Sequence, residues 1–99
     1  MPKPKISFAP EAVRLFLQLS AAERSRLRGV IQASLAEDDA TVVSKNRFPL
    51  RRPSEHAAFE LRNDDLRVFY RVVDNEVRIT LIGRKQGNQL LVGGKRFTL

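Results

Sequence analysis

Apolar and polar residues alternate through three short runs in the carboxy-terminal half of the chain, which predicts three antiparallel strands. The runs cover residues 57–62, 66–73 and 76–82, and the turn-forming pairs Asn63-Asp64 and Asp74-Asn75 separate them. One side of these strands is apolar and predicts a core face made of Ala57, Phe59, Leu61, Leu66, Val68, Tyr70, Val72, Val77, Ile79 and Leu81.

The other side of the same strands is charged, although hydrophobic burial does not require it to be. It collects Glu60, Arg62, Arg67, Phe69, Arg71, Arg78 and Thr80. This face is the candidate working surface, with a plain solvated sheet surface as the alternative. On it, Phe69 either stacks on a nucleobase or is covered by the carboxy-terminal segment or by a partner helix. Tyr70 is expected in the core, with its hydroxyl bonded locally.

The amino-terminal half predicts a brief strand at 6–8 and two helices. Pro10 suits the start of a helix over 10–19, and Ser20 with Glu23 forms a capping box that starts a second helix at Ala21. The second helix is expected to end near Asp38. The buried stripes are predicted at Val13, Phe16 and Leu17 in the first helix and at Leu27, Val30, Ile31, Ser34 and Leu35 in the second.

Residues 41–56 lack a clear period and predict a loop with a short strand or turn inside it. Beyond Gly83, a further strand at 89–92 and a reversal at Gly93-Gly94 are expected. The order βααβββ(β) indicates an α+β fold, with two amino-terminal helices packed on one face of a twisted antiparallel sheet of about four strands. The 99 residues suit a single domain, 1–99.

Charge and composition narrow the classes of partner. Eighteen lysines and arginines against eleven acids give a net charge of +7, which favours polyanions or an acidic protein. The absence of cysteine excludes disulfides and thiolate metal sites. No apolar run reaches the length of a membrane span and no secretory signal is visible, so we expect a cytoplasmic protein without a membrane partner. A basic loop cluster is a second candidate nucleic-acid contact, or else a solvated loop: Lys45, Arg47, Arg51 and Arg52.

The sequence gives little support for a bound metal or cofactor. His56 is the only histidine and is interpreted as a surface residue, and the acids Glu37, Asp38 and Asp39 are expected to be solvated. The glycines form no phosphate-binding motif. We therefore expect no metal and no cofactor.

The succession of a strand, two helices and a meander resembles the RelE/ParE superfamily of bacterial type II toxin–antitoxin toxins. The most specific piece is Leu61-Arg62, a polar turn, and then 66–72, LRVFYRV, which is similar to that family's "LR…YRLVYQV" signature. A looser match is FPLR at 48–51. The resemblance implies a toxin held by a cognate antitoxin. Its RelE branch comprises metal-independent endoribonucleases that cut mRNA on the ribosome, and its ParE branch poisons DNA gyrase.

By this resemblance, Arg67 corresponds to the central phosphate-binding arginine, and Arg84 and Lys85 to a basic pair after the last long strand. Arg67 and Arg84 are expected to share one patch against the scissile phosphate, with Lys85 as a phosphate contact or acid. Glu60 is a candidate base, or otherwise a structural ion pair with neighbouring arginines. The chain departs from the RelE pattern, because Ala58 and Glu60 replace two lysines and Leu91 replaces a tyrosine.

Three functions therefore stay open from the sequence. The leading one is a RelE-like endoribonuclease acting on mRNA and the ribosome. The lost lysines and tyrosine favour, as the alternative, a non-nucleolytic gyrase inhibitor of the ParE kind. The third is a catalytically degenerate module that only binds an antitoxin.

Overall fold

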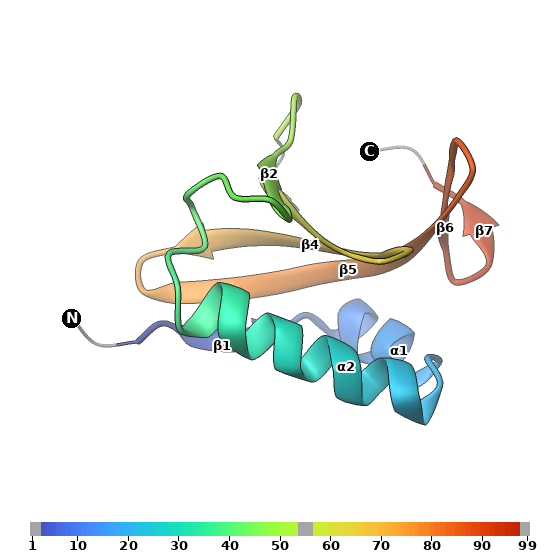
Figure 1. Cartoon of the computed structure of the whole chain (residues 1–99), viewed down its shortest axis with the longest axis horizontal. Coiled ribbons are helices and arrows are strands. Elements are labelled where there is room, and N and C mark those ends of the chain that lie inside the picture. The colour runs from blue at the N-terminus through green and yellow to red at the C-terminus, as the bar shows by residue number, and fades with distance from the viewer. Residues whose placement is uncertain (1–2, 54–56, 98–99) are drawn as a thin grey trace.

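The computed structural model describes residues 3–53 and 57–97, and two helices lie beneath a strongly curved sheet (Figure 1). The elements follow in the order β1 (Lys5–Phe8), α1 (Pro10–Leu17), α2 (Ala21–Ile31), η1 (Gln32–Ala36), β2 (Arg47–Pro49), β3 (Phe59–Asn63), β4 (Leu66–Val73), β5 (Glu76–Gln86), β6 (Gln89–Val92) and β7 (Lys95–Arg96). The α+β architecture of two helices on a sheet is therefore confirmed.

The described residues form seven strands where the sequence predicted about four. Their order is β2-β3-β4-β5-β6-β7 with antiparallel neighbours, while β1 pairs in parallel with the first half of β5. Strand β6 pairs only with the end of β5. Strands β1 and β6 therefore lie one after the other along the same edge of β5. Both ends of the sheet, β2 and β6–β7, rise on the side away from the helices (Figure 1). That side is called the concave face below.

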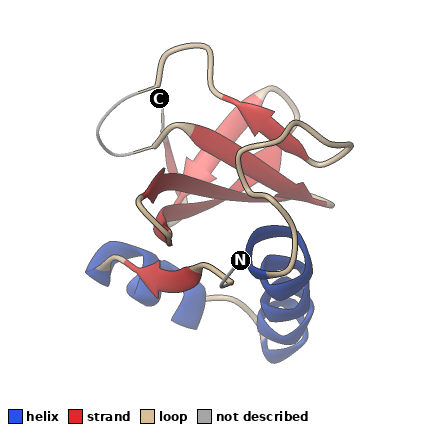
Figure 2. Cartoon of the chain, turned by 90° about the vertical axis from the view of Figure 1, so that its left-hand side faces the viewer, coloured by secondary structure: helices blue, strands red, loops and turns tan. Residues whose placement is uncertain are grey.

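The helices cover the opposite face of the sheet and enclose the core (Figure 2). Leu27, Ile31 and Leu35 from the second helical segment are buried against the sheet, as their spacing predicted. From the sheet, fully buried side chains come from β3, β4 and β5: Leu61, Leu66, Val68, Tyr70 and Ile79. Within the described ranges, no helix is long and apolar enough to cross a membrane.

The second helix starts as its sequence predicts. The Ser20 side chain accepts from the Glu23 amide and the Glu23 carboxylate accepts from the Ser20 amide, both at 3.1 Å. This reciprocal pair satisfies two amides that the first turn would otherwise leave unbonded.

The first helix ends at Leu17 rather than at Leu19, and its predicted buried stripe is wrong at Val13 and Leu17, although Phe16 packs against the core. Ala12 and Leu15 are buried, whereas the side of Val13 and Leu17 is 43% and 65% exposed. The helix is apolar over more than one stripe, so periodicity alone does not say which stripe meets the sheet.

Candidate nucleic-acid interface

A β-bulge in β5 decides which side chains reach the concave face. Val68 lies opposite Ile82 and Tyr70 lies opposite Ile79, so β5 contains one residue more than β4 between these pairs. The extra residue is Thr80, whose hydroxyl donates to the Phe69 carbonyl at 3.2 Å. Beyond a bulge, every following residue lies on the face opposite to the one that uninterrupted alternation predicts.

The predicted sharing of one patch by Arg67 and Arg84 is therefore wrong. Arg84 lies opposite the fully buried Leu66, on the helix side of the sheet. Its guanidinium donates to Glu23 Oε2 at 2.7 Å and to Asp65 Oδ2 at 2.6 Å. The hydrogen bond from Arg84 lowers the pKa of Glu23, and the same bond raises the pKa of Arg84. Arg84 thus ties β5 to the start of α2 and to the β3–β4 turn.

Arg67 remains on the concave face, where it meets Glu60 and Arg62. Glu60 Oε1 lies 3.6 Å from Arg67 Nε, and Glu60 Oε2 accepts from Arg62 Nη2 at 3.3 Å. The side chains of Glu60 and Arg67 are 16% and 14% exposed, and that of Arg62 is 47% exposed. The predicted ion pair between Glu60 and the arginines is confirmed, and it places one carboxylate between two guanidinium groups.

The β3–β4 turn fixes the direction of the Arg67 guanidinium. Its Nη1 donates to the carbonyls of Asp64, at 2.7 Å, and Leu66, at 2.9 Å. Asp64 adopts a positive φ of 51°, which an aspartate in a tight turn tolerates. Arg67 is thereby held in place by Nη1 and Nε, and its third guanidinium nitrogen, Nη2, takes no part in these contacts.

Lys85 lies on the same side as Arg67. Gly83 is directly opposite Arg67, and Lys85 is two residues further along the same strand, so the two residues share a face. The Lys85 amide donates to the Asp65 carbonyl at 2.7 Å, and the residue is exposed. Gly83 is needed between them, since a Cβ at this position would lie 2.9 Å from the Leu91 carbonyl oxygen.

Phe48 belongs to this cluster, although the sequence analysis gave it no role. It is directly opposite Glu60 in the β2–β3 pair, and the Arg62 guanidinium carbon lies 4.3 Å from its ring centroid. Phe48 and Arg62 are far apart in sequence, and the sequence around Phe48 has no periodic pattern. Only the match of FPLR to the toxin family pointed to this segment. The concave cluster is thus Phe48, Glu60, Arg62, Arg67 and Lys85.

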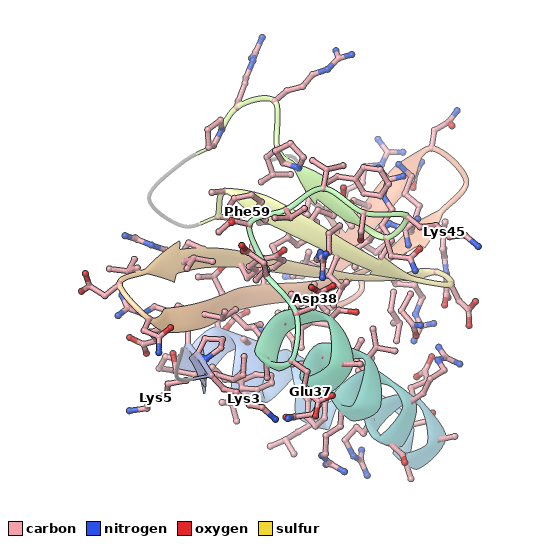
Figure 3. The ribbon with its side chains drawn as sticks, turned by 60° about the vertical axis from the view of Figure 1, so that its left-hand side comes forward. Lys3, Lys5, Glu37, Asp38, Lys45 and Phe59 are labelled. Atoms are coloured by element: carbon pink, nitrogen blue, oxygen red, sulfur yellow. The ribbon has the colours of Figure 1, made fainter. Side chains whose placement is uncertain are left out.

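One member of the predicted basic loop cluster cannot contact nucleic acid in this structure. Arg47 is 5% exposed and donates to the carbonyls of Val42 and Ser34 and to Asp38 Oδ2 at 2.9 Å. It anchors the loop to η1, because β2 directs it toward the helix layer opposite Leu61. Lys45, Arg51 and Arg52 are exposed on the loop, and Figure 3 shows Lys45 pointing outward.

Arg71 and Arg78 lie directly opposite each other on the concave side of β4 and β5, before the bulge. Arg78 donates to Glu76 at 3.0 Å. They are therefore separated from the concave cluster along the strands, beyond Phe69, and form a second basic region on the same side of the sheet.

The two aromatic residues of β4, Phe69 and Tyr70, are both buried. Phe69 is 1% exposed, so the protein itself covers it, and of the two alternatives for this ring the stacking on a base is wrong. Tyr70 is buried as predicted, with its hydroxyl donating to the Ala40 carbonyl at 2.6 Å. Burial raises the pKa of Tyr70 to about 12.

The acidic segment after the second helix is tied to basic side chains. Lys3 Nζ lies 3.7 Å from Glu37, a proximity visible in Figure 3, and Asp38 pairs with Arg47. Among the described residues no group of three or more acidic or imidazole side chains is placed to hold a metal ion. His56, predicted to be a surface residue, lies outside the described ranges.

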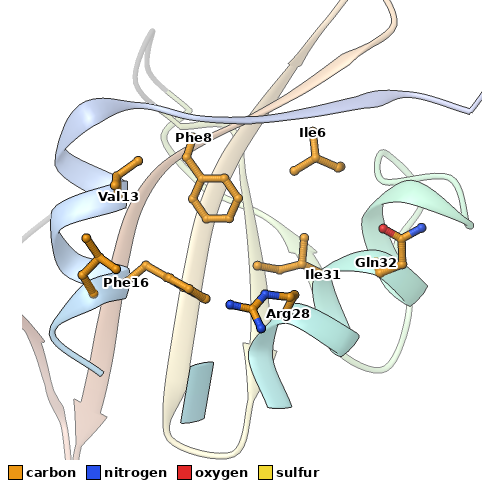
Figure 4. A pocket seen from close by; sticks show the side chains of 8 residues that line it. Ile6, Phe8, Val13, Phe16, Arg28, Ile31 and Gln32 are labelled. Atoms are coloured by element: carbon orange, nitrogen blue, oxygen red, sulfur yellow. The ribbon is translucent and has the colours of Figure 1, made fainter. Parts of the chain in front are cut away.

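An apolar groove opens on the other side of the molecule, between β1, α1 and α2 (Figure 4). Its volume is about 360 Å³, and its lining is Ile6, Phe8, Val13, Phe16, Leu17, Arg28, Ile31 and Gln32. Phe8 and Phe16 meet edge to face at 5.8 Å, and the Arg28 guanidinium lies 5.6 Å from the Phe16 centroid. The exposed stripe of α1 therefore forms one wall of a groove with a cationic side chain.

Comparisons with known proteins identify the fold. No family model and no curated protein matches the chain. Among solved structures, it is similar to a chain of the toxin–antitoxin complex RelBE2 from Mycobacterium tuberculosis, with a TM-score of 0.70 and 21% identity. The match covers 86% of this chain and 94% of that chain. The chain has a RelE-like toxin fold, so the resemblance drawn from the sequence is confirmed at the level of the fold.

Proposed function

We propose that this protein is the toxin of a type II toxin–antitoxin system and that it cleaves mRNA on the ribosome. The similar solved structure is described as a toxin–antitoxin complex, which supports the toxin class. The observation that carries the endoribonuclease activity is the Glu60 carboxylate held between Arg62 and Arg67 on the concave face. The net charge of +7 favours encounter with RNA.

The concave cluster offers each group that RNA transesterification needs. Glu60 takes the proton of a 2′-hydroxyl, whose oxygen forms a bond to the adjacent phosphorus. Arg67 binds the phosphate oxygens and stabilises the charge of the phosphorane, while Arg62 holds the Glu60 carboxylate in position. Lys85 gives a proton to the 5′-oxygen as the bond from phosphorus to that oxygen breaks. The products are a 2′,3′-cyclic phosphate and a 5′-hydroxyl, and no step requires a metal.

Substrate binding also prepares the base in this mechanism. In the free protein Glu60 interacts with both guanidinium groups. A phosphate that engages Arg67 competes with the Glu60 carboxylate for the same guanidinium. Glu60 Oε1 is thereby released from Arg67 when the substrate arrives and is free to contact the 2′-hydroxyl, while Arg62 stays bonded to Oε2. Arg84 has no part in this scheme, because Glu23 and Asp65 hold it on the helix side.

The test is incubation of the purified protein with ribosomes carrying a defined mRNA. We expect cleavage within the decoding site, with a 2′,3′-cyclic phosphate at the new 3′ end. Growth arrest by the protein without any such cleavage would contradict the endoribonuclease proposal.

A gyrase inhibitor of the ParE kind is the second candidate. It is favoured by the hydrogen bonds of Arg67 to two turn carbonyls and by Ala58, which offers no side-chain base at the edge of the cluster. A supercoiling assay separates the two candidates, since only an inhibitor of this kind traps gyrase on DNA. If expression causes no growth defect, a module that only binds an antitoxin is favoured instead.

We further propose that the apolar groove binds the antitoxin. Val13 and Leu17 expose large apolar surface there, which marks an interaction site on a small protein. An amphipathic helix fits such a groove, and acidic residues beside its apolar face would pair with Arg28. The groove and the concave cluster lie on opposite layers of the fold, the helices and the sheet.

A further inference from the structure

We infer that Arg62 and Phe48 form a stacking platform for a nucleobase of the bound RNA, an inference that rests on the proposed function. The Arg62 guanidinium carbon lies 4.3 Å above the Phe48 ring centroid. At that distance the cation and the ring attract each other, and the planar group covers the aromatic face.

The orientation of this platform is fixed by neighbouring groups. Arg62 Nε and Nη2 both donate to Glu60 Oε2, at 3.4 and 3.3 Å, and these bonds restrain the plane of the guanidinium. Phe48 is held by the strand pair, since it lies directly opposite Glu60. A restrained plane loses less conformational entropy when a ligand stacks on it.

Enough of Arg62 is open to receive a ligand. Its side chain is 47% exposed, compared with 14% for Arg67 and 16% for Glu60. From the concave side, Arg67 is placed to bind a phosphate and Glu60 to contact a hydroxyl. Arg62 presents a more accessible planar cation. Guanidinium planes stack on unpaired bases in RNA complexes.

Position connects the platform to the proposed chemistry. Arg62 lies directly opposite Arg67, and Phe48 lies directly opposite Glu60, so the four side chains form two adjacent cross-strand rows on one face. Opposite residues in such rows are about 4.5–5.5 Å apart at their Cβ atoms. A base stacked on Arg62 then belongs to a nucleotide next to the phosphate bound by Arg67, and stacking sets the position of that phosphate.

The platform reads the presence of a base rather than its identity, because every base has a flat face. The ligand class is therefore single-stranded RNA of any sequence at this nucleotide. Leu91 cannot supply this contact, since it lies opposite Arg84 on the helix side and has no ring.

The test compares the intact protein with its R62K variant, which keeps the charge and loses the plane. Two RNA oligomers are the probes, one with 2′-deoxy-2-aminopurine at its central position and one abasic there, both uncleavable at that point. We expect R62K to lower the affinity for the first oligomer about tenfold, with weaker fluorescence quenching, and to leave the affinity for the abasic oligomer unchanged. F48L is expected to give the same pattern.

R14K is the matched control, because Arg14 is also a surface arginine held by a glutamate, Glu11, but on helix α1. It should change neither affinity. Equal losses of affinity for both oligomers in R62K, or no loss for either, would overturn the platform while leaving the endoribonuclease proposal intact. If the unmodified protein binds neither oligomer and does not cleave mRNA on ribosomes, both proposals fail together.

Discussion

At the scale of single residues, Glu60 is the side chain on which the proposed chemistry depends most. It is the carboxylate of the concave cluster and interacts with two of its cations. The sequence identified Arg67 because alternation and the family signature agreed there, Glu60 from alternation, and Lys85 from the family resemblance alone. It could not identify Phe48, since the stacking of this ring on Arg62 depends on the pairing of β2 with β3.

Replacing Glu60 by glutamine should slow mRNA cleavage on ribosomes by about 100-fold or more, as expected for removal of a general base. The amide keeps the size of the side chain but does not accept the 2′-hydroxyl proton. Single-turnover cleavage with ribosomes in excess measures the effect. E11Q is the control, because Glu11 also pairs with an arginine but lies on α1. A variant E60Q as fast as the unmodified protein would exclude Glu60 as the base.

The ionisation of Tyr70 can be followed by absorbance without overlap, because it is the only tyrosine and the chain has no tryptophan. Burial favours its neutral form, so ionisation should be centred near pH 12 instead of at the ordinary value of 10.0. The unfolded state loses this proton first, and the contribution of Tyr70 to stability should therefore be constant below pH 10 and fall as pH rises toward 12. Tyrosinate absorbance measures the midpoint, and a midpoint at the ordinary value in the folded protein would contradict the burial of Tyr70.

At the scale of elements, the bulge in β5 has the largest consequence. It keeps Ile82 in the core opposite Val68 and turns Arg84 toward α2. The sequence contains a signal for it, because Leu81 and Ile82 are adjacent apolar residues in a strand that otherwise alternates. That signal does not locate the extra residue, since a strand covered on both faces gives the same pattern.

Arg84→Met should reduce the free energy of unfolding by about 1–2 kcal/mol at neutral pH, because Glu23 and Asp65 lose a charged partner. The pKa of Glu23 is lowered in the fold, so its contribution is present above about pH 4.5 and is lost as pH falls through the folded pKa.

The unmodified protein should consequently lose stability more steeply below pH 4.5 than R84M does, as measured by urea unfolding at several pH values. Cleavage by folded R84M should equal that of the unmodified protein, whereas R67M should lose cleavage. Loss of cleavage in a stably folded R84M would instead show that Arg84 is needed for catalysis.

At the scale of the whole molecule, the fold separates two surfaces. The concave face of the sheet carries the cluster of one carboxylate and three cations, and the helix layer carries the apolar groove. The sequence indicated the charged surface correctly but placed Val13 and Leu17 in the core. It could not do otherwise, because the side of a wide apolar helix that meets a sheet is set by packing at Ala12 and Leu15.

Leu17→Asp should weaken antitoxin binding about tenfold or more and leave the stability of the toxin almost unchanged, because Leu17 is 65% exposed. Isothermal titration with the protein encoded beside this chain, if it is small and acidic, measures the affinity. V43D is the matched control, since Val43 is 61% exposed on the loop before β2. Equal binding by L17D and V43D would exclude the groove as the docking site.

The sequence by itself determined the helices and the three central strands, although not the full extent of the sheet. Alternation fixed three strands, the Ser20–Glu23 pair fixed the start of α2, and the family signature indicated the toxin fold. Only the tertiary structure decided which face is occupied by the cations beyond the bulge, Arg84 and Lys85. One additional residue in β5 costs little locally and leaves no distinct pattern, yet it reverses every side chain that follows. The concave cluster therefore contains Arg67 and Lys85, and Arg84 binds the helix layer.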